Sequence, residues 1–145
     1  MKKRKEFWDS EYSRPAHLAL SDEPAEDLEK FTRFLERNYG RKFLNVTAQA
    51  LDMGCGNGRN LIYLAKEFGM RGVGYDISKK AIEQAQSASK DLPLTFFVAS
   101  LAKPIFLPDA SVTIALDMMS SHVLKKAERE ALRAEVLRIL RPQGW

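Results

Sequence analysis

Short apolar runs alternate with helical patterns through most of the chain. Four runs cover residues 48–52, 72–76, 94–98 and 112–116; the first two end in an aspartate, and the last is followed by one. Runs of this length between turn residues are typical of buried strands. Apolar residues at helical spacing lie between most of them, over residues 61–68, 81–85 and 127–140. Strands that alternate with helices predict an α/β fold, a parallel sheet with helices on both faces.

The residues at the predicted helix ends agree with these elements. Gly69 ends the predicted helix over residues 61–68, and Ser78 is a good N-cap for the helix that contains residues 81–85. Pro142 stops the helix over residues 127–140.

An additional helix is expected before the first strand. Apolar residues recur at helical spacing over residues 28–35, Ser21 or Asp22 is a candidate N-cap, and the helix should end near residues 38–40. Residues 7–20 contain aromatic side chains but no clear period. We therefore divide the chain into a tail or lid over residues 1–20 and a domain over residues 21–145.

Composition and charge narrow the class of protein. The 145 residues are 45% hydrophobic and 29% charged, which is typical of one globular domain. No apolar run approaches the roughly 18 residues that a membrane helix needs, and the N-terminus does not resemble a signal peptide. We expect a cytoplasmic protein with no membrane contact. One cysteine and two histidines far apart predict no metal site.

The net charge of +4 belongs to one short segment. Residues 2–5 are four of the 23 basic residues, and the rest of the chain balances its 19 acidic ones. Such a segment could touch nucleic acid, but a frayed, solvated terminus is the favoured interpretation. Nucleic acid is therefore not an expected partner.

A glycine-rich segment joins the first strand to the next helix. Within residues 51–60, Gly54, Gly56 and Gly58 lack the Cβ atoms that would keep a ligand from the backbone, and they permit positive φ. In parallel α/β sheets, ligands bind at this carboxyl end of the strands. A nicotinamide dinucleotide is disfavoured, because Arg59 stands where its fingerprint requires a third glycine.

Asp76 ends the second predicted strand, 24 positions after Asp52. A carboxylate at this place can accept hydrogen bonds from both hydroxyls of a ribose. It could instead cap the following helix, although Ser78 already suits that position. We favour ribose binding.

Four segments resemble the motifs of the class I S-adenosylmethionine-dependent methyltransferases. These are residues 51–58, 74–78, 107–112 and 140–144, in the order and at the spacing of that family. The resemblance covers residues 48–145 and implies a Rossmann-like, doubly wound sheet of strand order 3-2-1-4. The family's sheet continues beyond strand four. We therefore expect a truncated domain that keeps the cofactor-binding half and lacks strands five to seven.

The resemblance implies S-adenosylmethionine as the cofactor and S-adenosylhomocysteine as the product. Asp52 would help to hold the cofactor's ammonium, Asp76 its ribose, and Ile77 one face of its adenine. Leu101 stands where the family often has an acidic residue. The implied cofactor-binding residues are Asp52, Gly54, Cys55, Gly56, Gly58, Asp76, Ile77, Ser100, Leu101, Ala102, Asp117 and Met118.

The implied reaction is in-line displacement at the sulfonium methyl by a small-molecule acceptor. Because the leaving group is a neutral thioether, positioning matters more than acid catalysis. His122 and Tyr12 are weak candidates for a general base, and His122 could equally be a surface residue. Tyr12, Arg14 and Met119 are candidates for a lid or acceptor pocket; the alternative for residues 7–15 is an apolar strap on the outer helices.

Two other functions stay open. A non-catalytic S-adenosylmethionine-binding module could form a homodimer through a bare strand-four edge. It would hold the cofactor without consuming it. An RNA methyltransferase that uses the basic segment would bind RNA in a salt-dependent way.

Overall fold

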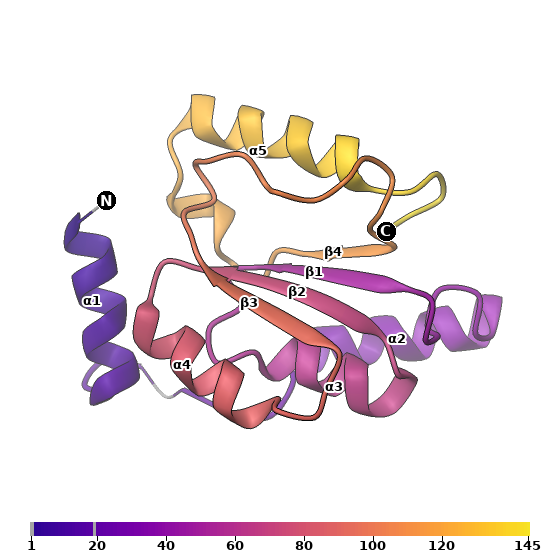
Figure 1. The fold of residues 1–145 in the computed structure, drawn as a ribbon, viewed down its shortest axis with the longest axis horizontal. Helices are drawn as coiled ribbons and strands as arrows, with labels where there is room; N and C mark the ends of the chain where they lie inside the picture. Colours follow the sequence, from indigo (N-terminus) through magenta and orange to yellow (C-terminus); the bar gives the residue numbers. More distant parts are fainter. Residues whose placement is uncertain (1, 19) are drawn as a thin grey trace.

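The computed structural model describes residues 2–18 and 20–145; Met1 and Ala19, in the predicted tail, lie outside the described residues. One parallel sheet contains β1 (Gln49–Met53), β2 (Arg71–Asp76), β3 (Leu94–Val98) and β4 (Ile114–Leu116) (Figure 1). The strand order is β3-β2-β1-β4, and all pairings are parallel. The predicted α/β class and strand order are confirmed.

Helices cover both faces of the sheet (Figure 1). On one face lie α2 (Glu26–Tyr39), α3 (Arg59–Phe68) and α4 (Lys79–Ala88), and on the other lies α5 (Lys126–Ile139). A short 3-10 helix, η1 (Ser121–Val123), follows β4, and α1 (Lys2–Ser13) stands apart from the sheet layers.

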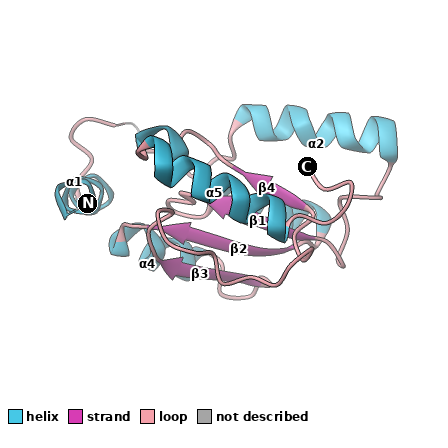
Figure 2. Ribbon diagram, turned by 90° about the horizontal axis from the view of Figure 1, so that it is seen from above, coloured by secondary structure: helices cyan, strands magenta, loops and turns pink. Residues whose placement is uncertain are grey.

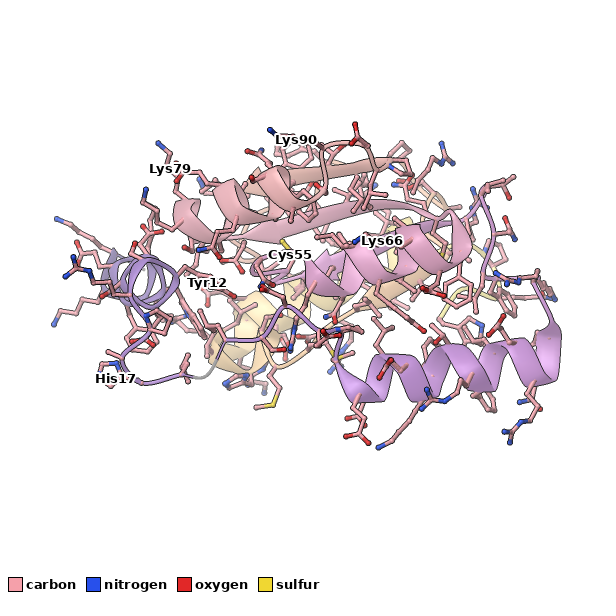
Figure 3. All side chains as sticks on the ribbon, turned by 90° about the horizontal axis from the view of Figure 1, so that it is seen from below. Tyr12, His17, Cys55, Lys66, Lys79 and Lys90 are labelled. Atoms are coloured by element: carbon pink, nitrogen blue, oxygen red, sulfur yellow. The ribbon has the colours of Figure 1, made fainter. Side chains whose placement is uncertain are left out.

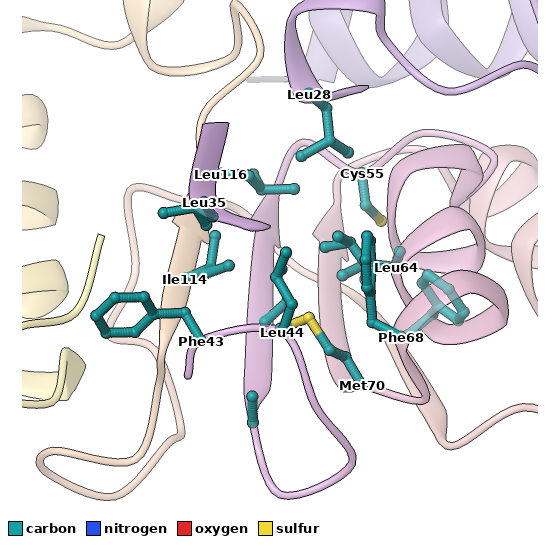
Figure 4. Close-up of a cluster of buried hydrophobic side chains, with 14 of the residues drawn as sticks. Leu28, Leu35, Phe43, Leu44, Cys55, Leu64, Phe68, Met70, Ile114 and Leu116 are labelled. Atoms are coloured by element: carbon teal, nitrogen blue, oxygen red, sulfur yellow. The ribbon is translucent and has the colours of Figure 1, made fainter. Parts of the chain in front are cut away.

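The core has two parts, one on each face of the sheet. The first contains Leu28 and Leu64 against Ile114 (Figure 4), and the second contains Leu51 and Ile139. Successive residues of a strand point to opposite faces. Accordingly, Ala50 joins the first cluster and its neighbour Leu51 joins the second.

The predicted start of α2 is wrong, because its candidate caps serve other contacts. The Ser21 hydroxyl accepts a hydrogen bond from the Glu23 N–H (3.0 Å), and Asp22 accepts one from the Asn57 amide (2.8 Å). The helix begins at Glu26, with no side-chain cap. At α4 the prediction is confirmed: the Ser78 hydroxyl accepts from the Ala81 N–H (3.2 Å).

The predicted frayed terminus is also wrong, since residues 2–13 form α1. Asp9 accepts hydrogen bonds from the Ser78 hydroxyl (2.7 Å) and the Lys80 N–H (3.2 Å), and the Gln84 amide donates to the Tyr12 carbonyl (2.8 Å). These bonds attach α1 to the start and the middle of α4. Figure 2 shows α1 beyond the arrowheads of the strands, across their carboxyl ends.

A buried glutamate holds the turn that follows α1. The Glu11 side chain is 1% exposed and accepts hydrogen bonds from the ring of His17 (2.6 Å) and from the N–H groups of residues 16–18. The bond from His17 lowers the pKa of Glu11 to about 2. This turn leads the chain away from α1.

The outer edge of β4 is not bare, contrary to expectation. The Trp145 N–H donates to the Thr113 carbonyl (3.0 Å), and its carbonyl accepts from the Ala115 N–H (2.9 Å). The Trp145 ring lies 5.7 Å from the ring of Phe31 and 5.8 Å from that of Phe43, measured between centroids. Aromatic packing therefore holds the last residue against the strand edge.

Gly58→Ala is expected to destabilise this fold by about 3 kcal/mol, because it combines positive φ with overpacking. Gly58 has φ +80°, and a Cβ there would lie 2.8 Å from Phe96 and 3.0 Å from Ala85 in the core. Gly69→Ala is the matched control: its φ is +68°, but its Cβ would meet the exposed Val46, which can move aside. Urea unfolding measures both variants, and equal losses would contradict the packing argument.

Candidate functional site

A cavity of about 370 Å³ lies at the carboxyl ends of the strands, between the sheet and α1. Such volumes are typical of small-molecule pockets. The sequence-predicted residues that line it are Tyr12, Gly54, Asp76, Ile77, Ser100, Leu101, Met118, Met119 and His122. One cavity therefore brings together residues from α1, from the loops after β1, β2 and β3, and from the segment after β4.

The glycine loop is tightly packed where it meets the cavity. Gly54 and Gly56 have φ of +79° and +53°, in the region that favours glycine. A Cβ on Gly54 would collide with Ser120, and one on Gly56 would collide with the Tyr12 hydroxyl. Figure 3 shows Tyr12 reaching from α1 toward the loop that carries Cys55. The two glycines thus let Ser120 and Tyr12 pack closely against the loop backbone, and Gly54 also lines the cavity.

Asp76 connects the end of β2 to this loop. One carboxylate oxygen accepts from the Gly56 N–H (2.9 Å), and the other accepts from the Ser78 N–H (2.8 Å). Burial raises the pKa of Asp76, although these hydrogen bonds oppose the shift. Each oxygen has a second lone pair, so the carboxylate can still accept hydrogen bonds from a ligand. Asp76 therefore orders the loop and faces the cavity at once.

Asp52 is a fully buried acid near the glycine loop. Its side chain is 0% exposed, and neither carboxylate oxygen has a hydrogen-bond partner among the described residues. Burial raises the pKa of Asp52 to about 7, although the side-chain amide of the neighbouring Asn60 lowers it in part. Asp52 does not line the cavity. An ionised carboxylate here would be stabilised by a nearby cation.

Two predicted loop residues have packing roles. Cys55 is 5% exposed and belongs to the first core cluster (Figure 4), and burial raises the pKa of its thiol. This is the environment of an inert cysteine. Gly58 faces Phe96 and Ala85. Neither residue lines the cavity.

The structure leaves four other predicted residues outside the cavity lining: Gly56, which faces the Tyr12 hydroxyl, and Asp117, Ala102 and Arg14. Asp117 is exposed and accepts hydrogen bonds from the N–H groups of Ser120 (3.0 Å) and Ser121 (3.1 Å), so it stabilises the start of η1. Ala102 packs against the second core cluster, and Arg14 is exposed beyond the end of α1.

Sequence reasoning missed part of the α1 wall. Arg4, Trp8 and Tyr12 all line the cavity. Their spacing of four residues is the signal that could have revealed a single helical face. Ser120 was also missed; its hydroxyl donates to the Met53 carbonyl under the loop.

Neither a metal site nor a membrane span is evident in the part of the chain that the structure describes. No group of three or more His, Cys, Asp and Glu side chains there is placed to hold a metal ion. No helix among those residues combines the length and apolarity needed to cross a bilayer.

Comparisons with curated proteins point to one family. The sequence profile described as "Methyltransferase domain" matches residues 50–144. The chain is 32% identical over 132 residues to the 27-O-demethylrifamycin SV methyltransferase of Amycolatopsis mediterranei, covering 88% of this chain and 47% of that protein. It is 27% identical to the methyltransferase GfsG of Streptomyces halstedii, covering 77% and 41%. The chain spans 28–49% of the length of the curated relatives that it matches.

Solved structures share the fold. A methyltransferase from Thiobacillus denitrificans in complex with S-adenosyl-L-homocysteine superposes with a TM-score of 0.65 at 24% identity, covering 92% of this chain and 51% of that one. A structure described by the conversion of a disulfide bond into a thioacetal group during echinomycin biosynthesis has a TM-score of 0.73 at 21% identity, covering 96% of this chain and 56% of that one. With the profile match over most of the sheet, these findings show that the chain belongs to the methyltransferase-domain family.

Proposed function

We propose that this chain is the cofactor-binding part of an enzyme that transfers a methyl group from S-adenosylmethionine to a small-molecule acceptor and releases S-adenosylhomocysteine. The observation that carries the proposal is Asp76, which faces the cavity from the end of β2 while its carboxylate holds the glycine loop. Membership of the methyltransferase-domain family supports it.

The residues around the cavity suit such a cofactor. Gly54 lines the cavity without a side chain, and Asp76 offers acceptors for ribose hydroxyls. Ile77 and Leu101 supply apolar walls for an adenine. The carboxylate of Asp52 has no hydrogen-bond partner among the described residues and lies two positions before Gly54, outside the cavity lining; a cationic ammonium near it would stabilise its charge. When bound, S-adenosylmethionine supplies an activated methyl group and a neutral leaving group.

The chain's own contribution is to position the acceptor and exclude water. Trp8 and Tyr12 close the α1 side of the cavity, and Met118 and Met119 supply apolar surface after β4. A methyl transfer at an oriented nucleophile needs this positioning above all.

We assign the general base for an acceptor hydroxyl to His122. Of the two histidines, both among the described residues, His122 lines the cavity and His17 does not. Tyr12 is not suited to be the base, because burial raises its pKa to about 12 and its hydroxyl therefore stays protonated at neutral pH. A hydroxyl acceptor also agrees with two relatives, whose names describe O-methylation: the rifamycin enzyme and the O-methyltransferase resE of Aspergillus sclerotiorum.

Calorimetric titration with S-adenosylhomocysteine and with NAD⁺ tests the cofactor assignment. We expect saturable binding of S-adenosylhomocysteine and none of NAD⁺, because the loop lacks the dinucleotide spacing. The reverse preference would contradict the proposal. Transfer of labelled methyl groups to hydroxyl-bearing small molecules then separates an enzyme from a module that only binds the cofactor.

A further inference from the structure

A cation lines the cavity without a counter-ion. Arg4 is part of the lining and is half-buried, and no carboxylate among the described residues lies within ion-pair distance of its guanidinium. Its neighbour Lys5, by contrast, pairs with Asp9 at 3.3 Å. A guanidinium facing an apolar cavity is suited to bind an anion, because its planar N–H groups match a carboxylate in two parallel hydrogen bonds.

Arg4 lies far along α1 from the glycine loop. Tyr12 touches Gly56, and Arg4 stands eight residues earlier on the same helical face, which is about 12 Å along a helix axis. A cofactor with its amino-acid part on the loop and its ribose on Asp76 would therefore keep its own carboxylate away from Arg4.

The other charged groups of the cavity do not neutralise Arg4. The carboxylate of Asp76 lies at the loop end, where it accepts hydrogen bonds from two backbone N–H groups. Lys2 and Lys103 line an adjoining hollow by the end of β3 together with Lys5, whose charge is paired with Asp9, so the hollow adds positive charge beside the cavity. Clustered charge of one sign attracts ligands of the opposite sign.

The remaining surface around the cavity is apolar. Met118, Val123 and Leu124 line it, and Met119 is 79% exposed at its rim. Methionine-rich surfaces adapt to apolar ligands of different shape. We propose that the methyl acceptor is an apolar molecule that carries a carboxylate or similar anionic group, and that Arg4 binds this group. This inference rests on the proposed function and names the class of its substrate.

A matched pair of probes measures the charge preference directly. Naphthalene-2-carboxylate and naphthalene-2-carboxamide have the same shape but differ in charge. Each is titrated into the chain with and without saturating S-adenosylhomocysteine. The proteins are the wild type, Arg4→Gln, Arg4→Lys, and Lys3→Gln, which removes one charge from the same turn at an exposed position off the cavity.

We expect the wild type to bind the carboxylate about tenfold more tightly than the carboxamide, as one charged hydrogen-bonded contact provides. Arg4→Gln should abolish this preference, Arg4→Lys should keep part of it, and Lys3→Gln should leave it unchanged. The affinity for S-adenosylhomocysteine should be the same in all four proteins.

Three results would overturn the inference. The first is no preference for the carboxylate in the wild type, and the second is the same loss of that preference in Arg4→Gln and Lys3→Gln. The third is a loss of S-adenosylhomocysteine affinity in Arg4→Gln as large as its loss of affinity for the carboxylate probe. The last result would assign Arg4 to the cofactor. A chain that does not bind S-adenosylhomocysteine at all would contradict the proposed function instead, because the probe comparison also runs without it.

Discussion

Asp76→Ala should weaken the binding of S-adenosylhomocysteine about 100-fold, because two hydrogen bonds to a charged acceptor are lost. The carboxylate also accepts from the Gly56 and Ser78 N–H groups, so the loop that would carry the amino-acid part of the ligand loses an anchor as well. Isothermal calorimetry measures the loss of affinity.

The control for this experiment is Asp91→Ala, which removes an exposed carboxylate outside the cavity. Circular dichroism melting shows whether each variant is folded. Asp76→Asn adds a further comparison, since it keeps one oxygen acceptor and should retain part of the affinity. An affinity of folded Asp76→Ala within twofold of the wild type would remove Asp76 from the cofactor site.

Asp52 should make the ligand-free chain less stable as the pH rises from about 4 to about 7. Burial raises its folded-state pKa to about 7, from an ordinary value of 3.8. The folded state therefore holds a proton that the unfolded state has released, and that stabilisation is lost as the pH passes through the folded-state pKa. The free energy of unfolding should fall by a few kcal/mol over this range.

Asp52→Asn isolates this effect, because an amide does not titrate. Burial also raises the pKa of Asp76, which contributes a change of the same sign in both proteins. The measurement is urea unfolding of both proteins at pH 5 and at pH 8. We expect the wild type to lose more stability than the variant between these values; parallel losses would show that Asp52 is ionised in the folded chain throughout.

The pattern of apolar and polar residues along the sequence was sufficient to predict the sheet and the cavity at its carboxyl edge. Each of the four apolar runs overlaps a strand, because a parallel sheet covered by helices favours apolar residues on both faces of its inner strands. Parallel strands bring their carboxyl ends to one edge, so Gly54, Asp76 and Met118 meet there although they are far apart in sequence.

Tertiary contacts decided what local pattern could not. Two contacts hold α1 in position: Asp9 binds the start of α4, and Tyr12 packs against the glycine loop. The contacted residues lie about seventy and forty positions further along the chain. Asp117 shows the converse: its position after β4 predicted contact with the cofactor, and in the structure its carboxylate accepts hydrogen bonds from a local turn while the residue lies outside the cavity lining. A sequence motif places a side chain near a site without fixing its partners.

The most direct test of the central claim is to map the binding of S-adenosylhomocysteine on the amide resonances of this 145-residue chain. We predict the largest shifts at Gly54, Ile77 and Leu101 on the cavity, with little change at Lys66 and Gln84, which line a separate hollow beyond Tyr12. Shifts confined to that outer hollow, with none on the cavity, would contradict the account.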